Sequence, residues 1–457
     1  ILAWTTTPWT LPSNTALTVG PKIDYSVIST YNQYTFKFIN VIMASDLISK
    51  VFGGNYIKVN SDDDLIFDSS KDKKIPYLVQ ENFCGKDLLN IRYEQLWDEA
   101  PLPNDNPNDA FRVIEGDFVT TEDGTGIVHT APTFGADDAK VAKLANPPIP
   151  ALLIEDEDKQ LVPLVDLQGK FRKELGSLGG KFVKNEYYDD NDIPPKSVDV
   201  EIAIRLKEQN RAFKVEKYVH SYPNCWRTDK PILYYPLDSW FIKVNDKKER
   251  LVELNKTINW KPKSTGEGRF GNWLANANDW NLSRSRFWGI PLPIWKSSDS
   301  KETIVIGSML ELKNEIKKSL SKGFMQNDPF DGFDPNDMSD LNYNKIDLHK
   351  NIVDNIVLCS SSGKKMFRES DLIDVWFDSG SMPYAQWHYP FENKDFIDGG
   401  RRFPADYIAE GVDQTRGWFY TLHAISTLVF GKKAYKNVVS NGLVLDKTGQ
   451  KMSKRLG

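Results

Sequence analysis

The chain has 457 residues, a formal net charge of −5, 40% apolar residues and 26% charged residues. This composition is typical of a globular protein, and the length predicts two or three domains, because single cores rarely grow this large. No apolar run approaches the ~20 residues needed to span a bilayer, so a membrane role is not expected. The acidic balance gives no global sign of a nucleic-acid binder, so any RNA contact must be local.

The cysteines and the termini add two expectations. Cys84, Cys225 and Cys359 lie far apart, which argues against a disulfide framework and favours a reducing, cytoplasmic compartment. The chain opens at Ile1 without a leader and stops inside a lysine-rich motif. We therefore expect a fragment of a longer protein.

Short β-rich segments separated by turns fill the first 180 residues. Candidate strands rich in β-branched and aromatic residues lie at residues 24–29, 35–43, 111–119 and 127–130. A compact, mixed β domain is predicted for residues 1–218.

The segment from Ser197 to Asn210 has two readings. Ser197 is a suitable N-cap for a helix. However, Val198, Val200, Ile202 and Ile204 alternate as in a strand. Both readings remain open from the sequence.

The second half of the chain divides into three predicted segments. Residues 219–295 are crowded with Trp, Pro and Arg and are expected to form a connecting stem. Residues 296–368 are polar, with a lysine-rich helix predicted around residues 308–322, and are interpreted as an insertion. Residues 369–457 form the last segment.

Helix and strand patterns alternate near the end of the chain, which is typical of an α/β domain. Residues 438–439 and 443–445 are typical of buried strands. A helix that stops at Gly431 is predicted from apolar residues at helical spacing, namely Trp418, Thr421, Leu422, Ile425, Leu428 and Val429.

A lysine-rich motif, GQKMSKR, occupies residues 449–455. Ammonium groups on a loop can stabilise negative charge that develops on the phosphates of a nucleotide. Lys451 and Lys454 are the candidates for this role. The alternative is a solvated turn without function.

A second motif, AEGVDQTRGWF, covers residues 409–419. It is expected to open the predicted helix and to place carboxylates and free N–H groups at the helix N-terminus, which suits a nucleotide. In the alternative reading, Asp413 only caps the helix.

The third constellation combines WTTTPWTLP at residues 4–12 with GTGIVHTAP at residues 124–132, followed by GADD at residues 135–138. Read alone, the threonines suggest a strand and the histidine a structural role. Together they supply hydroxyls that can position a water molecule and a carboxylate that can hold an ammonium group.

These strings resemble, over essentially the whole chain, the isoleucyl-tRNA synthetase family of class I aminoacyl-tRNA synthetases. Two strings are similar to sequences of the isoleucine-specific enzymes, DVWFDSGS at residues 374–381 and HSYPNCWR at residues 220–227. A third, SRSRFWG at residues 283–289, is shared with the valine- and leucine-specific relatives. The resemblance implies an α/β fold overall, with a mixed β-rich editing domain inserted in a Rossmann-like catalytic domain.

The resemblance also assigns roles in synthesis. The family activates isoleucine with ATP and Mg²⁺ and transfers it to tRNA-Ile. Glu410, with Gly411, would contact the isoleucyl-adenylate, and Asp413 and Gln414 would hold ribose and amino-acid polar groups. Trp376 and Trp418 would wall the side-chain pocket, although a tryptophan such as Trp376 is by default core filling.

The editing roles fall on the first domain. Thr5, Thr6 and Thr7 would position water and the terminal ribose of mischarged Val-tRNA-Ile. The ring of His129 would limit the pocket so that isoleucine is excluded. Asp138, in preference to Asp137, would anchor the substrate ammonium.

The chain departs from the family pattern in three places. Cys225 is followed by Thr228 and Cys359 by serines, so too few ligands remain for zinc, and no metal site is predicted. Asn441 stands where some relatives have His. The His-x-Gly-His motif that grips ATP is missing, so the upstream catalytic half and a downstream anticodon-binding domain are expected elsewhere in the same enzyme.

Three interpretations are therefore open. The first is an isoleucine enzyme whose chain is competent mainly for editing. A valine- or leucine-specific relative is the second, which the strings around Trp376 and Gln414 disfavour. The third is a paralogue that binds tRNA without chemistry, against which the intact Thr5–Thr7 run and Asp138 argue.

Overall fold

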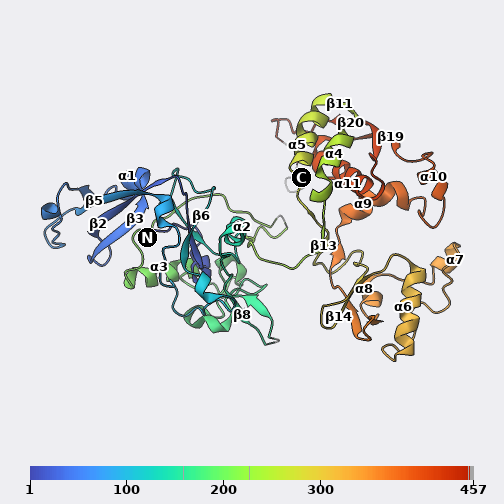
Figure 1. Cartoon of the computed structure of the whole chain (residues 1–457), viewed down its shortest axis with the longest axis horizontal. Coiled ribbons are helices and arrows are strands. Elements are labelled where there is room, and N and C mark those ends of the chain that lie inside the picture. The colour runs from blue at the N-terminus through green and yellow to red at the C-terminus, as the bar shows by residue number, and fades with distance from the viewer. Residues whose placement is uncertain (158, 226, 451, 453–457) are drawn as a thin grey trace. The chain divides into compact units, whose positions relative to one another are not determined.

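A computed structural model describes residues 1–157, 159–225, 227–450 and 452 (Figure 1). The chain divides into two compact units, unit 1 at Ile1–Leu237 and unit 2 at Asp238–Gly457. Within the described residues, every helix is too short or too polar to cross a membrane.

The larger sheet of unit 1 has four strands in the order β3-β2-β5-β4. Its strands are β2 (Asp24–Tyr31), β3 (Phe38–Ala44), β4 (Tyr56–Lys58) and β5 (Ile75–Cys84). The predicted strands at residues 24–29 and 35–43 are confirmed as β2 and β3, with ends shifted by a few residues. Tyr25, Ile28 and Met43 point into a core and are fully buried.

A smaller sheet carries the N-terminal motifs. Its strands are β1 (Ala16–Val19), β6 (Arg112–Glu115) and β7 (Ile127–Thr130). β1 lies in the middle, parallel to β6 and antiparallel to β7, with Leu17 opposite His129. β7 has the predicted bounds, but the strand expected at residues 111–119 is shorter. Phe111 adopts a φ of 57°, outside the β region, and the four-residue β1 offers no partner beyond Glu115.

The open question at residues 197–210 is settled as a helix, α3 (Val198–Glu208), with the Ser197 hydroxyl accepting a hydrogen bond from the Val200 N–H. Val198, Ile202 and Leu206 are buried at a four-residue spacing, whereas Val200 is 46% exposed. The apolar stripe thus follows the helical period, and the apparent alternation is incidental.

Unit 2 contains a three-stranded parallel sheet in the order β11-β20-β19. Its strands are β11 (Asn259–Lys261), β19 (Ala405–Gly411) and β20 (Tyr435–Asn441), and helix α11 (Trp418–Phe430) connects β19 to β20. The predicted helix and its end are confirmed, because Gly431 follows with a φ of 64°. This strand–helix–strand crossover agrees with the α/β expectation.

One expected strand at the end of the chain is wrong. β20 contains residues 438–439 as predicted, but residues 443–445 are irregular, and their side chains are 42–72% exposed. β20 ends at Asn441, opposite Gly411, where its partner β19 also ends. Residues 443–445 lie beyond the end of this β19–β20 ladder, so the apolar run does not continue β20 as a strand.

A four-stranded antiparallel sheet, β15-β14-β17-β16, forms a separate part of unit 2 with its own core around Trp295, Ile316 and Met366. Its elements are β14 (Ile294–Ser297), β15 (Thr303–Val305), β16 (Leu358–Cys359), β17 (Lys365–Arg368) and helix α6 (Met309–Ser321). α6 confirms the predicted lysine-rich helix, and Ser308 caps it by accepting from the Glu311 N–H.

The remaining helices have four to eleven residues, and the remaining strands have two or three. The helices are α1 (Ile48–Val51), α2 (Ala136–Leu144), α4 (Lys248–Asn255), α5 (Gly271–Ala275), α7 (Asp340–Tyr343), α8 (Lys350–Val353), α9 (Val375–Ala385) and α10 (Lys394–Asp398). The strands are β8 (Leu153–Glu155), β9 (Leu161–Pro163), β10 (Phe241–Ile242), β12 (Trp280–Asn281), β13 (Ser283–Arg284) and β18 (Leu372–Ile373).

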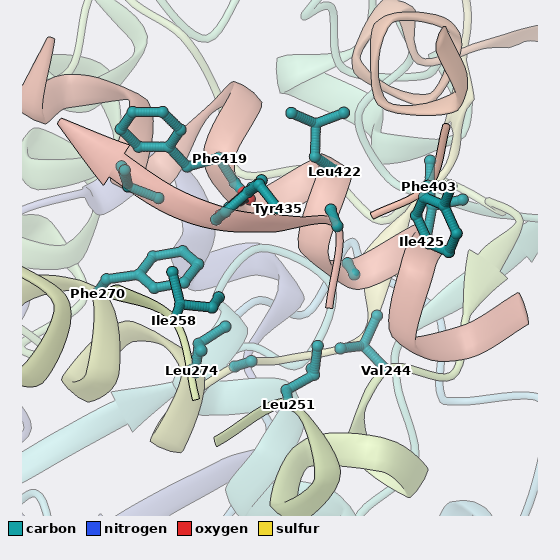
Figure 2. Packing of buried hydrophobic residues seen from close by; sticks show 14 of the residues in the cluster. Val244, Leu251, Ile258, Phe270, Leu274, Phe403, Phe419, Leu422, Ile425 and Tyr435 are labelled. Atoms are coloured by element: carbon teal, nitrogen blue, oxygen red, sulfur yellow. Dashed lines mark hydrogen bonds between the residues drawn. The ribbon is translucent and has the colours of Figure 1, made fainter. Parts of the chain in front are cut away.

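The largest core of unit 2 lies where α11 packs over β20. Figure 2 shows Phe419 and Leu422 of α11 near Tyr435 of β20, with Phe270 and Leu251 contributed by earlier segments. The Tyr435 hydroxyl donates a 2.8 Å hydrogen bond to the Phe419 carbonyl. This core fixes the helix that carries the candidate adenylate residues at its start.

Removing the Phe419 ring should destabilise this core. Phe419 is fully buried, so Phe419→Ala should lower the free energy of unfolding by about 3–5 kcal/mol through lost burial and a cavity. Val429→Ala is the control on the same helix, because Val429 is 66% exposed, and it should change stability by less than about 0.5 kcal/mol. Urea unfolding measures both variants, and equal losses would contradict the packing described.

Candidate functional site

The threonine run of unit 1 forms a bend and not the strand of the alternative reading. Thr5, Thr6 and Thr7 are half-buried and precede a 3₁₀ helix, η1 (Pro8–Ser13). The Thr7 N–H donates to the Thr5 hydroxyl at 3.0 Å, and the two hydroxyls lie 3.4 Å apart. The turn that begins η1 therefore gathers the hydroxyls on one short stretch of backbone.

Thr10 connects this stretch to His129. Its hydroxyl donates to the Thr7 carbonyl at 2.8 Å and lies 3.0 Å from Nε2 of His129. The two residues are 119 positions apart in the chain. The antiparallel pairing of β1 with β7 brings them together, because β1 follows η1 directly.

His129 is held inside the protein on both ring nitrogens. Its side chain is on β7, the residue is only 7% exposed, and Nδ1 lies 2.8 Å from the side-chain nitrogen of Asn14. Burial lowers the pKa of His129 to about 4, because a charged imidazole is poorly solvated there. The ring is therefore neutral at physiological pH.

Asp138 lies in the first turn of α2, just after β7. Its carboxylate accepts a 2.8 Å hydrogen bond from the Ala131 N–H, which places it beside the end of the strand that carries His129. Burial raises the pKa of Asp138 to about 6, and the nearby Asp137 adds to the shift. Asp137 is exposed. The preference for Asp138 as the buried anchor agrees with this geometry and stays a prediction.

Further residues support the threonine bend, and the sequence did not single them out. Asp199 accepts from the Trp9 N–H at 2.9 Å and lies 3.4 Å from the Lys184 ammonium. Burial is the main cause of its raised pKa. Thr10 lies inside the threonine motif and Asn14 lies two residues after it, so both could have been found there. Asp199 lies 190 positions from Trp9 and has no local signal.

The adenylate motif of unit 2 does not open a helix as expected. Glu410 lies on β19, residues 412–416 form a 3₁₀ helix, and α11 begins only at Trp418. The Trp418 N–H is bound by the side-chain oxygen of Gln414 at 2.9 Å. The reading of Asp413 as the helix cap is wrong, because Gly417 occupies the N-cap position.

Trp376, Gln414 and Trp418 meet around Gly417. A Cβ added to Gly417 would lie 2.7 Å from the Gln414 side-chain oxygen and 3.3 Å from the Trp376 ring. Trp418 donates from its indole nitrogen to the Ser379 carbonyl of α9 at 2.9 Å. Trp376 is 41% exposed, so it is not simply core filling.

Glu410 and Gly411 end β19, opposite Ser440 and Asn441 of β20. The carboxyl ends of parallel strands are where α/β sheets bind ligands, which suits the predicted contacts with an adenylate. Lys451 and Lys454 lie outside the described residues.

The expectation of no zinc concerns Cys225 and Cys359. Both are free thiols. Among the residues that the structure describes, His, Cys, Asp and Glu do not gather in any group of three or more suited to a metal ion. The expectation stays a prediction.

The Asp138 carboxyl should make stability depend on pH. Its pKa rises from 3.8 to about 6 on folding. Between about pH 4 and pH 6 the folded state therefore binds more protons than the unfolded state, and the free energy of unfolding falls as the pH rises. Asp138→Asn removes this component. The free energy of unfolding of the variant, measured with urea, should therefore rise relative to that of the parent as the pH is raised from about 4 to about 6. Asp137→Asn is the exposed control, and an equal gain there would contradict burial as the cause.

Comparison with known proteins identifies the family. A sequence profile described as "tRNA synthetases class I (I, L, M and V)" matches residues 69–457. The whole chain is 56% identical to an isoleucine–tRNA ligase of Bacteroides fragilis, covering 41% of that protein, and 58% identical to one of Cytophaga hutchinsonii, covering 40%. An isoleucine–tRNA ligase of Clostridium tetani is 42% identical over the whole chain and 36% of its own length. The chain thus spans about two fifths of the length of these relatives. It belongs to the class I tRNA synthetase family.

Proposed function

We propose that unit 1 hydrolyses aminoacyl esters of tRNA-Ile that carry valine, as the editing domain of an isoleucine–tRNA ligase. The observation that carries this proposal is the hydrogen-bonded line from Thr5 and Thr7 through Thr10 to His129. It joins a set of hydroxyls to a neutral ring, and Asp138 adds a carboxylate beside the end of the same strand.

Each group supports a separate part of the reaction. Threonine hydroxyls can position a water molecule and the terminal ribose, and ionised Asp138 can hold the ammonium of the aminoacyl group. His129 has both nitrogens engaged and is uncharged. It is therefore unsuited to act as a general base, and we assign it the role of a wall that limits the side-chain pocket.

A pocket that limits side-chain size would help to discriminate isoleucine from valine. Isoleucine enzymes are themselves the established example, and their single-step preference for isoleucine over valine is about 150-fold. One methylene cannot be discriminated much further by binding. A second pocket that rejects the larger side chain and hydrolyses the smaller one supplies the remainder.

Unit 2 supports a second role, as part of the synthetic site. Trp376, Gln414 and Trp418 meet around Gly417. Glu410 and Gly411 are the last residues of β19, and Asp413 comes just after them. We assign these six residues to isoleucyl-adenylate, and Lys451 and Lys454 to the phosphates of ATP. Magnesium bound with ATP would neutralise phosphate charge. In this proposal unit 1 is inserted in a Rossmann-like domain, to which the parallel sheet of unit 2 belongs.

Two other interpretations are less well supported. The named relatives at 42–58% identity are all isoleucine–tRNA ligases, which disfavours a valine- or leucine-specific enzyme. A paralogue that binds tRNA without chemistry would not need the hydrogen-bonded hydroxyl line or the half-buried carboxylate.

Substitutions of His129 and of Asp138 should have different effects on hydrolysis by the proposed editing site. His129→Ala should open the pocket, so that correctly charged Ile-tRNA is hydrolysed. Asp138→Ala should reduce hydrolysis of Val-tRNA by about 10- to 150-fold, since a hydrogen bond to a charged group contributes roughly 1.5–3 kcal/mol. Deacylation of both charged tRNAs is timed for each variant and the parent.

Matched controls come from the same unit. Asp137→Ala removes the exposed neighbouring carboxylate, and His220→Ala removes an exposed imidazole. Both should hydrolyse Val-tRNA at the parental rate. If His129→Ala still spares Ile-tRNA and keeps full activity on Val-tRNA, His129 is structural and the size limit lies elsewhere.

Synthesis gives a separate prediction. The chain has no His-x-Gly-His motif, so we expect negligible isoleucine-dependent exchange of pyrophosphate into ATP. The exchange assay uses a full-length isoleucine–tRNA ligase as its positive control. Robust exchange by this chain alone would contradict the proposed division of the synthetic site.

A further inference from the structure

The side chain of Asn14 has one orientation that satisfies its surroundings. Its nitrogen lies 2.8 Å from the Ala16 carbonyl and 3.3 Å from the Thr130 carbonyl, and both oxygens can only accept. Its oxygen lies 2.6 Å from the Tyr93 hydroxyl, which donates to it. Rotating the amide by 180° would direct its oxygen at two carbonyl oxygens. The rotated orientation is therefore excluded in a buried site.

The orientation of Asn14 determines which nitrogen of His129 carries the hydrogen. The Asn14 nitrogen also lies 2.8 Å from Nδ1 of His129. An amide nitrogen has no lone pair to accept with, so Nδ1 must be the acceptor and cannot bear a hydrogen. In a neutral ring the hydrogen is therefore on Nε2.

The other side of the ring agrees with this assignment. Nε2 lies 3.0 Å from the Thr10 hydroxyl, whose own hydrogen points to the Thr7 carbonyl at 2.8 Å. Thr10 is thus free to accept from the ring. A directed line of donors runs from Tyr93 to Asn14, from Asn14 to His129, from His129 to Thr10, and from Thr10 to the backbone of Thr7.

Tyr93 begins this line from a different part of the chain. It lies 79 positions from Asn14, on the segment beside β6, where its N–H donates to the Phe111 carbonyl at 2.9 Å. Burial raises the pKa of the Tyr93 hydroxyl, so the hydroxyl keeps its hydrogen at physiological pH. Without it, the Asn14 oxygen would be a buried acceptor without its donor, which favours displacement of the amide.

We propose that Tyr93 is a positioning residue that acts through Asn14 to hold His129 as the Nε2–H tautomer and thereby fixes the threonine bend. The link to hydrolysis rests on the proposed editing function. The tautomer of His129 does not, because it is a property of the protein without substrate.

Nitrogen NMR of the whole chain, labelled with ¹⁵N-histidine, tests the tautomer directly. The chain has five histidines, and the signals of His129 are identified by their loss in His129→Gln. In the parent we expect a protonated Nε2 and an unprotonated Nδ1 from pH 5.5 to pH 8.

Tyr93→Phe tests the positioning role. It should shift the Nδ1 signal of His129 and slow hydrolysis of Val-tRNA by about two- to tenfold, as expected for one lost hydrogen bond. Tyr25→Phe is the matched control. Tyr25 is also buried and donates a 2.6 Å hydrogen bond, to the Gly126 carbonyl. It should lose stability without changing the His129 signals.

Each outcome decides a separate point. A protonated Nδ1 in the parent overturns the tautomer assignment. A Tyr93→Phe variant with parental His129 signals overturns the positioning role, and altered signals with unchanged hydrolysis overturn its link to the reaction. If the parent hydrolyses no charged tRNA, the editing function fails, while the NMR result still decides the tautomer.

Discussion

The hydrogen bond between the Thr10 hydroxyl and the ring of His129 is the interaction on which the candidate editing site depends. It joins the short helix that follows the threonine run to the strand that leads to Asp138. The sheet makes this contact possible. β1 follows the helix in the chain and pairs antiparallel with β7, which carries His129. A shift of one residue in this register would turn His129 to the other face and separate it from Thr10.

Burial shifts the pKa values of the two titratable groups of this site, His129 and Asp138, in opposite directions. It keeps the His129 ring neutral, with both nitrogens engaged, so that the ring contributes shape and direction. The same cause makes the Asp138 carboxyl costly to ionise, so a bound ammonium would relieve that cost. In the proposed editing function, such a site would recognise a cationic amine by charge and a side chain by size, and the hydroxyls would position the water.

Unit 2 uses a different device, the close approach of backbone and side chains at the start of a helix. Gly417 leaves room for the Gln414 side-chain oxygen, which a Cβ would force to move, and for the Trp376 ring, which a Cβ would contact tightly. The Gln414 oxygen then binds the first N–H of α11, in place of a capping side chain. The packed core beneath α11 holds this start in place, so the placement of Trp376, Gln414 and Trp418 depends on the burial of Phe419 and Leu422.

The sequence by itself determined the features that local chemistry encodes. Serines at the starts of α3 and α6 and a glycine at the end of α11 mark helix ends through contacts within a few residues. The family followed from motifs that are continuous in the chain. Features that depend on distant partners were decided only by the tertiary structure. β6 is short and residues 443–445 are not a strand, because neighbouring strands end there. Tyr93 and Asp199 join the site only through contacts between segments far apart in the sequence. Such contacts leave no local pattern, because sheet register and packing create them.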